Sequence, residues 1–525
     1  MSPARAILYL ALAAVVLGLG IGAATGLTGK DEYLLGLRVP LEMMKGDHWW
    51  VPFLDGVPRL KKPPMLYWLG RASFETFGPS LLAARGITVA FALLLLGCTA
   101  WLGQQLTGRW RTGLLAAAVL LGMSGMASES RRLMLDVPVA ALSVAAFCCY
   151  LAWTQRPRAA PLLATAVCLC AALLTKGPIA FVACGGALVA LWATRRETLS
   201  LLRQRWPAHL LVLVLALALP AFWYLHVRDL YGAELAKAAH DELAARQIGF
   251  SANAALGIVA LSLPWTFVAL HGLWSRRREA HARFAGIWLL VTLVPFFFIR
   301  SFDRYLIGSL PALALLVAFA LENGSNPPWS RRLGSALPAL LAFLLIVLLW
   351  RWQLGEWWLL AAVLIWFVFV WWRAALRPAS LAASAALLWT TGWGIAFPAL
   401  GVNDVPPSVL DLARGKPVIL FDGPEPALLP ILEKRPLHQT SHLALPIAPG
   451  TLITVRAEDR AALDNQLAAL GLHVLRRLEY HALTSAGSGI RFAKQGADRS
   501  DWRQAWAERS PAPLMSTVQV LEVLP

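Results

Sequence analysis

Apolar runs of about 20 residues recur along most of this chain, and they restrict its fold more than any other feature of the sequence. Each run is long enough for an α-helix to cross the hydrocarbon core of a bilayer. The composition agrees, because 58% of the 525 residues are hydrophobic and only 15% are charged, whereas a soluble domain carries about 25% charged residues. The sequence therefore predicts an α-helical polytopic membrane protein.

The apolar pattern divides into about thirteen predicted spans. The first is longer than the apolar part of a secretory signal peptide and further spans follow it, so we expect it to be an uncleaved helix. The predicted spans are residues 6–28, 81–104, 112–127, 133–154, 160–175, 178–194, 207–227, 253–274, 283–300, 304–321, 335–351, 355–373 and 380–400.

Arginines collect in alternate loops between these spans and so mark one side of the membrane. By the positive-inside rule, that side is cytoplasmic, which places the N-terminus inside and, with an odd number of spans, the C-terminus outside. One pair, Arg131 and Arg132, falls on the outer side against this trend. The arginines on the inner side are Arg5, Arg109, Arg111, Arg156, Arg158, Arg195, Arg196, Arg203, Arg205, Arg276, Arg277, Arg278, Arg331, Arg332, Arg373 and Arg377.

The formal net charge of +17 agrees with this topology. Because the basic residues lie between hydrophobic spans, they are explained by membrane orientation and by contact with anionic lipids. No nucleic-acid-binding motif is present, so the sequence excludes nucleic acid as a partner. All six cysteines lie inside apolar runs without polar neighbours, which is typical of small buried residues and predicts no metal site.

The composition changes to that of a soluble domain after residue 402. We therefore predict a membrane domain at residues 1–402, including a first outer loop at 29–80, and a small α/β domain at residues 403–525 outside the membrane. Within the second domain, "KPVILFD" and "GTLITVRA" are predicted strands, and residues 458–470 are a predicted amphipathic helix. A second outer segment is predicted at residues 228–252.

The first outer loop contains the charged residues most suited to catalysis. Asp31 and Glu32 follow the end of the first span. A carboxylate at a membrane boundary can act as a general base, because partial desolvation brings its pKa closer to neutrality. Lys62 precedes two prolines, which stiffen the backbone and could fix the ammonium group against a phosphate. A solvated helix end and a lysine reaching towards the membrane surface are the alternatives.

Further ionisable residues lie where other spans meet the same outer side. Such residues are costly near a membrane and usually face cavities or partners. Together with the loop, they predict a pocket with acidic and basic groups that suits an anionic lipid carrying a sugar. These residues are Asp136, Lys176, Arg300, Asp303, Arg304 and Tyr305.

Several of these residues lie in motifs that resemble a known family. The motifs are Asp31-Glu32, "GDHWWVPFLDGVPRLKKPPMLYWL", "LMLDVPVAA", "LLTKGPIAF" and "RYLIGSLPALALL". Over about residues 1–320, the chain is similar to the bacterial aminoarabinose (lipid A) transferases, which are related to the dolichyl-phosphate-mannose protein mannosyltransferases. Both groups are GT-C glycosyltransferases. The resemblance implies a protein of the bacterial inner membrane whose C-terminal domain is periplasmic.

The resemblance also implies an activity and roles for individual residues. The expected reaction is an inverting transfer of a sugar, such as 4-amino-4-deoxy-L-arabinose, from undecaprenyl phosphate to lipid A or a similar acceptor on the periplasmic face. The family's acidic pair corresponds to Asp31 and Glu32, and its third acidic residue to Asp136. Its loop lysine corresponds to Lys62, and its late tyrosine to Tyr305. We expect Lys176 and Arg304 to bind the donor phosphate with Lys62 and Tyr305, because preorganised charges stabilise a developing anion.

Several alternatives stay open at this point. Lys61 and Gly308 depart from the residues usual in the family, and this leaves the sugar and the acceptor undetermined. A protein O-glycosyltransferase would use the same donor chemistry. A lipid flippase or transporter is a different class, but the sequence has no internal repeat. No cofactor is expected to be required, while participation of a divalent cation through Asp31 and Asp136 stays open.

Overall fold

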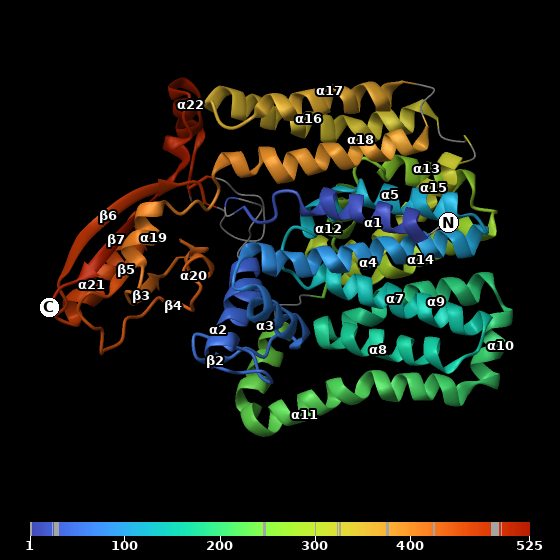
Figure 1. The fold of residues 1–525 in the computed structure, drawn as a ribbon, viewed down its shortest axis with the longest axis horizontal. Coiled ribbons are helices and arrows are strands. Elements are labelled where there is room, and N and C mark those ends of the chain that lie inside the picture. The colour runs from blue at the N-terminus through green and yellow to red at the C-terminus, as the bar shows by residue number, and fades with distance from the viewer. Residues whose placement is uncertain are drawn as a thin grey trace.

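The structure is a computed structural model that describes residues 3–23, 25, 31–244, 248–299, 301–322, 324, 327–373, 377–423, 426–484, 493–494 and 496–525. Figure 1 shows a large bundle of helices with a β-sheet, formed by C-terminal residues, beside one end of the bundle. The helices agree with the all-helical membrane part predicted from the apolar runs.

In the part of the chain that is described, eight helical segments are long and apolar enough to cross a membrane, or up to nine if one bent pair is counted as a span. The number of thirteen spans remains a prediction, although each predicted span overlaps a helix. The eight segments are α4 (Leu81–Thr107), α7 (Asp136–Gln155), α8 with α9 (Ala159–Lys176 and Ala180–Thr194, joined by η2, Gly177–Ile179), α11 (Trp206–Ala244), α14 (Ala280–Phe298), η3 with α15 (Asp303–Ser309 and Leu310–Glu322), α16 (Pro328–Trp352), and α18 with η4 and η5 (Pro378–Thr391, Gly392–Ala396 and Pro398–Leu400).

The remaining helices of the bundle are shorter. The bent pair replaces the single span predicted at residues 253–274, because its two helices meet at an angle of 104° where Pro264 cannot donate a backbone hydrogen bond. The outer segment predicted at 228–252 is mostly helical, since α11 continues to Ala244 with a kink at Tyr231. The shorter helices are α1 (Pro3–Gly18), α5 (Trp110–Leu121), α6 (Ser124–Glu129), α10 (Glu197–Gln204), α12 (Asn253–Ser262), α13 (Thr266–Ser275) and α17 (Trp357–Trp372).

The first outer loop folds into short elements above the bundle. The π-helix η1 (Glu32–Arg38) packs tightly against the segment before α7, and a Cβ atom on Gly36 would lie 2.3 Å from the backbone oxygen of Leu133. Only glycine permits this approach, which brings the start of η1 close to the start of α7. The other loop elements are α2 (Val39–Lys45), β1 (Phe53–Leu54), β2 (Val57–Pro58) and α3 (Met65–Phe77).

The C-terminal residues form a five-stranded mixed sheet in the order β4-β3-β5-β7-β6. Strand β3 is parallel to β4 and β5, whereas β7 is antiparallel to β5 and β6. The two predicted strands correspond to β3 and β5, and the predicted helix to α21. The elements are α19 (Pro407–Ala413), β3 (Val418–Phe421), α20 (Leu429–Leu432), β4 (His438–Thr440), β5 (Leu452–Arg456), η6 (Ala457–Asp459), α21 (Arg460–Ala469), β6 (Val474–Ala482), α22 (Arg499–Glu508), η7 (Ala512–Leu514) and β7 (Ser516–Val523).

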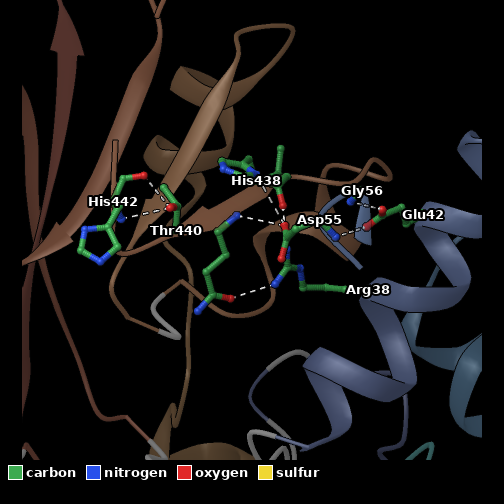
Figure 2. A network of polar contacts seen from close by, with 9 residues as sticks. Arg38, Glu42, Asp55, Gly56, His438, Thr440 and His442 are labelled. Carbon is green, nitrogen blue, oxygen red and sulfur yellow. Dashed lines mark hydrogen bonds and ion pairs between the residues drawn. The ribbon is translucent and has the colours of Figure 1, made fainter. Parts of the chain in front are cut away.

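A polar network joins this sheet to the first outer loop (Figure 2). The buried guanidinium group of Arg38 donates to Asp55 at 2.5 Å, to the backbone oxygen of Leu437 at 2.9 Å and to the side chain of Gln439 at 2.8 Å. Asp55 and Gly56 form the turn between β1 and β2 with positive φ angles of 54° and 75°, as a two-residue hairpin turn requires. The first outer loop and the C-terminal sheet are therefore held together by these hydrogen bonds. The division into two domains at residue 402 remains a prediction.

Candidate functional site

Five of the predicted site residues meet where the first outer loop covers the ends of α7 and α8. Asp31 directly precedes the π-helix η1, and Asp136 is the first residue of α7. Lys176 is the last residue of α8, which ends there because Gly177 has a positive φ of 62°. Arg304 and Tyr305 lie in the 3₁₀ helix η3. Four elements that are distant in sequence thus contribute to one charged cluster.

Arg304 connects the two carboxylates of this cluster. Its guanidinium group forms an ion pair with Asp31 and lies, through Nε, 3.3 Å from Oδ2 of Asp136. The other oxygen of Asp136 accepts a hydrogen bond from Lys176. The side chain of Asp31 is 33% exposed, whereas that of Asp136 is 3% exposed. Asp31 is therefore the carboxylate that a substrate can reach from water, and Asp136 holds the two cations in place.

Tyr305 packs directly against the lysine of the cluster. The ammonium group of Lys176 lies 3.4 Å from the centre of the Tyr305 ring, which is favourable for a cation–π interaction. Asp136, Lys176 and Tyr305 also line a cavity of about 20 Å³ between α7, α9 and α14. A cavity of this size holds about one water molecule. The cavity is therefore too small for a sugar phosphate, and the exposed part of the cluster is the side where Asp31 lies.

The charges within the cluster balance, because Asp31 and Asp136 offset Lys176 and Arg304. Such a site has no excess positive charge with which to bind a phosphate. Lys62 carries a further positive charge that acts on Lys176, but it could supply this charge to a phosphate only when released from its own acidic partner. Lys62 itself is held by Glu242 of α11, with 2.6 Å between Nζ and Oε1.

Glu242 is a residue that the sequence analysis missed. It belongs to the extension of α11 beyond the membrane span, and its neighbour Asp241 lies 3.5 Å from Lys61. Two adjacent acidic residues on α11 thus face two adjacent lysines of the first outer loop. The sequence could have predicted this contact. Residues 61–62 are both basic, residues 241–242 are both acidic, and both segments were predicted on the outer side of the membrane.

Glu32 does not join the cluster, although it follows Asp31 in sequence. Its carboxylate forms a two-point ion pair with Arg85 of α4, at 2.9 and 3.0 Å, and accepts a hydrogen bond from the backbone nitrogen of Leu133 at 2.9 Å. The side chains of Glu32 and Arg85 are 0% and 1% exposed. The arrangement gives Glu32 a structural position, and its predicted catalytic role remains untested.

The arginine pair that contradicted the positive-inside trend is also buried in the protein. Arg131 donates to the backbone oxygens of Leu19 and Val16 near the end of α1. Arg132 forms an ion pair with Glu129. Because both side chains are buried and held by contacts within the protein, they do not act as topology signals in a loop. Arg300, another expected pocket residue, lies outside the described residues.

The described residues contain no group of three or more histidine, cysteine or acidic side chains placed to hold a metal ion. Participation of a divalent cation is therefore not tested by this structure.

Comparison with known proteins gives this arrangement a context. Residues 33–232 match the family model of dolichyl-phosphate-mannose-protein mannosyltransferases. A solved structure of ArnT from Cupriavidus metallidurans, bound to undecaprenyl phosphate, superposes with a TM-score of 0.72 and 18% sequence identity, and the match covers 99% of this chain and 98% of that chain. The chain has the ArnT fold. The apo form of the same ArnT gives a TM-score of 0.71 at 19% identity, covering 98% of each chain.

Two curated relatives support the same similarity in sequence. The undecaprenyl phosphate-alpha-4-amino-4-deoxy-L-arabinose arabinosyl transferase of Pseudomonas aeruginosa (strain LESB58) is 30% identical over 308 residues, which are 54% of each protein. An uncharacterised protein of Aquifex aeolicus is 23% identical over 290 residues, which are 54% of this chain and 57% of the relative. The chain thus spans about half the length of the curated relatives that it matches. The GT-C fold and the resemblance predicted from the sequence are confirmed, and the chain is a multi-pass membrane protein.

Proposed function

We propose that this protein is an inverting glycosyltransferase that moves a sugar from undecaprenyl phosphate to lipid A or a similar lipopolysaccharide acceptor. The observation that carries the proposal is the cluster of Asp31, Asp136, Lys176 and Arg304 at the ends of spanning helices, with Lys62 beside it. The Pseudomonas relative is named for a transfer from undecaprenyl phosphate-aminoarabinose, which supports this sugar as the first candidate.

In the proposed reaction, an acceptor oxygen attacks the anomeric carbon of the sugar while the bond between that carbon and the phosphate oxygen breaks. The leaving undecaprenyl phosphate gains negative charge as the bond breaks. Lys62 and Arg304 would stabilise this charge, because fixed cations in a partly dry site need no reorganisation during the reaction. Tyr305 and Lys176 would support the phosphate from the buried side of the cluster.

Asp31 would act on the acceptor. If the acceptor is a hydroxyl group, Asp31 takes its proton as the new bond forms, which is the usual task of a general base. If the acceptor is a phosphate of lipid A, no strong base is required, and Asp31 would instead orient the sugar or Arg304. A protein O-glycosyltransferase is the second candidate within the same chemistry, supported by the match to the protein mannosyltransferase family.

We also propose that the cluster faces the periplasm and that the protein resides in the bacterial inner membrane. The first outer loop contacts the C-terminal sheet through Arg38, and Asp31 of the cluster directly precedes the helix that contains Arg38. The arginine-rich loops lie on the opposite side of the predicted spans. Its position at the helix ends, beside an exposed carboxylate, favours a transferase over a transporter, whose binding site usually lies near the middle of the membrane.

The proposal can be tested with purified protein in nanodiscs that contain the aminoarabinose donor and lipid A. Asp31→Asn keeps the shape of the side chain and removes its charge. Sugar transfer to a hydroxyl acceptor, measured by mass spectrometry, should fall by about 10²-fold, and transfer to a lipid A phosphate should fall less, through loss of the ion pair with Arg304. Asp303→Asn is a matched control, because Asp303 is an exposed acidic residue next to Arg304, and it should keep near-normal activity. Transfer to a peptide hydroxyl but not to lipid A would support the second candidate. Full activity of Asp31→Asn on both acceptors would contradict the assignment of this cluster.

A further inference from the structure

Helix α22 carries tryptophans and arginines at the point where the C-terminal sheet meets the bundle. The helix begins after Asp498, whose side chain forms a capping box with Asp501, and it continues to Glu508. Figure 1 shows α22 at the ends of α16 and α17, running across their long axes. A helix in this place has the direction expected of one that lies along a membrane surface.

Contacts between α22 and the end of α16 indicate where α22 lies relative to the membrane. Arg351, near the end of α16, donates to the backbone oxygen of Trp506 at 2.8 Å, and its guanidinium group lies 5.2 Å from the centre of the Trp506 ring. Trp352, the last residue of α16, stacks with Trp502 at 6.4 Å between ring centres. Because α16 is one of the helices suited to cross a membrane, its end lies at the level of the lipid headgroups.

One face of α22 combines exposed tryptophans with exposed arginines. A helix turns about 100° per residue, so Arg499, Trp502, Arg503 and Trp506 lie within an arc of about 100°. Trp502 and Trp506 are 38% and 45% exposed, and both arginines are exposed. The neighbouring residue Ala505 is buried against the protein. Trp352 and Arg351 at the end of α16 cover part of the two tryptophan rings, while the rest of these rings and both arginines are exposed.

The composition of this face matches one kind of partner. Tryptophan prefers the membrane interface, where its ring contacts the acyl chains and its N–H group meets water or headgroups. Arginine binds phosphate groups through paired hydrogen bonds. The acidic residues Asp501 and Glu508 lie on other sides of the helix, so they do not repel an anionic surface from this face.

We propose that α22 is an interfacial helix, which seats the C-terminal sheet on the outer surface of the bilayer by binding anionic phospholipid headgroups through Arg499 and Arg503 and by inserting Trp502 and Trp506 among them. The contacts of α22 with Arg351 and Trp352 place it beside the end of α16. The sheet is then held at two places, by the membrane through α22 and by the first outer loop through Arg38.

Spin labels on the full-length protein test the depth of this face. In a variant without the six native cysteines, Trp506→Cys and Glu508→Cys would be labelled and reconstituted into nanodiscs of phosphatidylglycerol and phosphatidylcholine. We expect the label at 506 to be more accessible to oxygen than to a water-soluble nickel chelate, and the label at 508 to show the reverse. Equal exposure of both labels to the nickel chelate would overturn the proposal.

Hydrogen exchange of α22 tests the role of the two arginines without cysteine substitution. With native tryptophans, exchange of residues 499–508 should be slower by roughly tenfold in nanodiscs with phosphatidylglycerol than in nanodiscs of phosphatidylcholine alone. The double variant Arg499→Gln/Arg503→Gln should lose this difference. Protection that is independent of anionic lipid, or that arises only when lipid A is added, would show that the face does not bind the phospholipid surface.

Discussion

Replacing Glu32 by Gln should destabilise the protein, although Glu32 lies beside the proposed base in sequence. The substitution keeps the size of the side chain and an oxygen that can accept from Leu133, but it removes the charge that balances Arg85. Arg85 would remain almost completely buried and would keep its hydrogen bonds to the backbone oxygens of Ile21 and Ala23 at 2.9 and 3.2 Å. Its ion pair with Glu32 would be lost.

The size of the effect follows from this burial. Removal of one partner from a buried ion pair costs about 3–5 kcal/mol, because the remaining charge is desolvated without compensation. At about 2 °C per kcal/mol, the unfolding temperature should fall by about 6–10 °C. Removal of both charges by Glu32→Leu/Arg85→Met should restore part of this loss, since apolar side chains of similar volume often replace a buried ion pair without cost.

Thermal unfolding of the purified protein in detergent, followed by intrinsic tryptophan fluorescence, measures this effect. Asp31→Asn is the comparison, because that side chain is partly exposed and Arg304 retains Asp136 as a partner. It should reduce sugar transfer and leave the unfolding temperature within about 2 °C of the parent. A Glu32→Gln variant that keeps the parent's unfolding temperature but loses sugar transfer would refute the structural role of Glu32. That result would instead support a catalytic role for this residue.

Two further predictions concern donor binding and orientation. Lys62→Ala should weaken binding of undecaprenyl phosphate by about 10- to 100-fold, the scale of one hydrogen bond to a charged group, whereas Lys61→Ala, which removes only the exposed pair with Asp241, should not. Glu242→Gln frees Lys62 and should maintain or strengthen this binding; equal affinities for all three variants would exclude Lys62 from the donor site. A periplasm-dependent reporter fused after Pro525 should be active, and a cytoplasmic signal there would contradict the proposed orientation.

The sequence by itself determined the class of the protein and the position of most of its elements. A long apolar run in a membrane folds as a helix, because a helix forms all of its backbone hydrogen bonds within itself and needs no water. Apolar periodicity also predicted three elements of the C-terminal sheet region, because a strand and a helix each repeat their buried side chains at a characteristic spacing. These elements are β3, β5 and α21. The motifs also named the charged residues that meet at the helix ends.

Only the tertiary structure decided which of those charges interact. Neighbouring residues of a helix point in different directions, so Asp31 faces Arg304 while Glu32 turns to Arg85, and no local pattern predicts this choice. The pair of Lys62 and Glu242 joins residues that are 180 positions apart. Ion pairs depend on distance and burial after packing, which the order of residues along a chain does not specify, and for this reason the connections within the site required the folded structure.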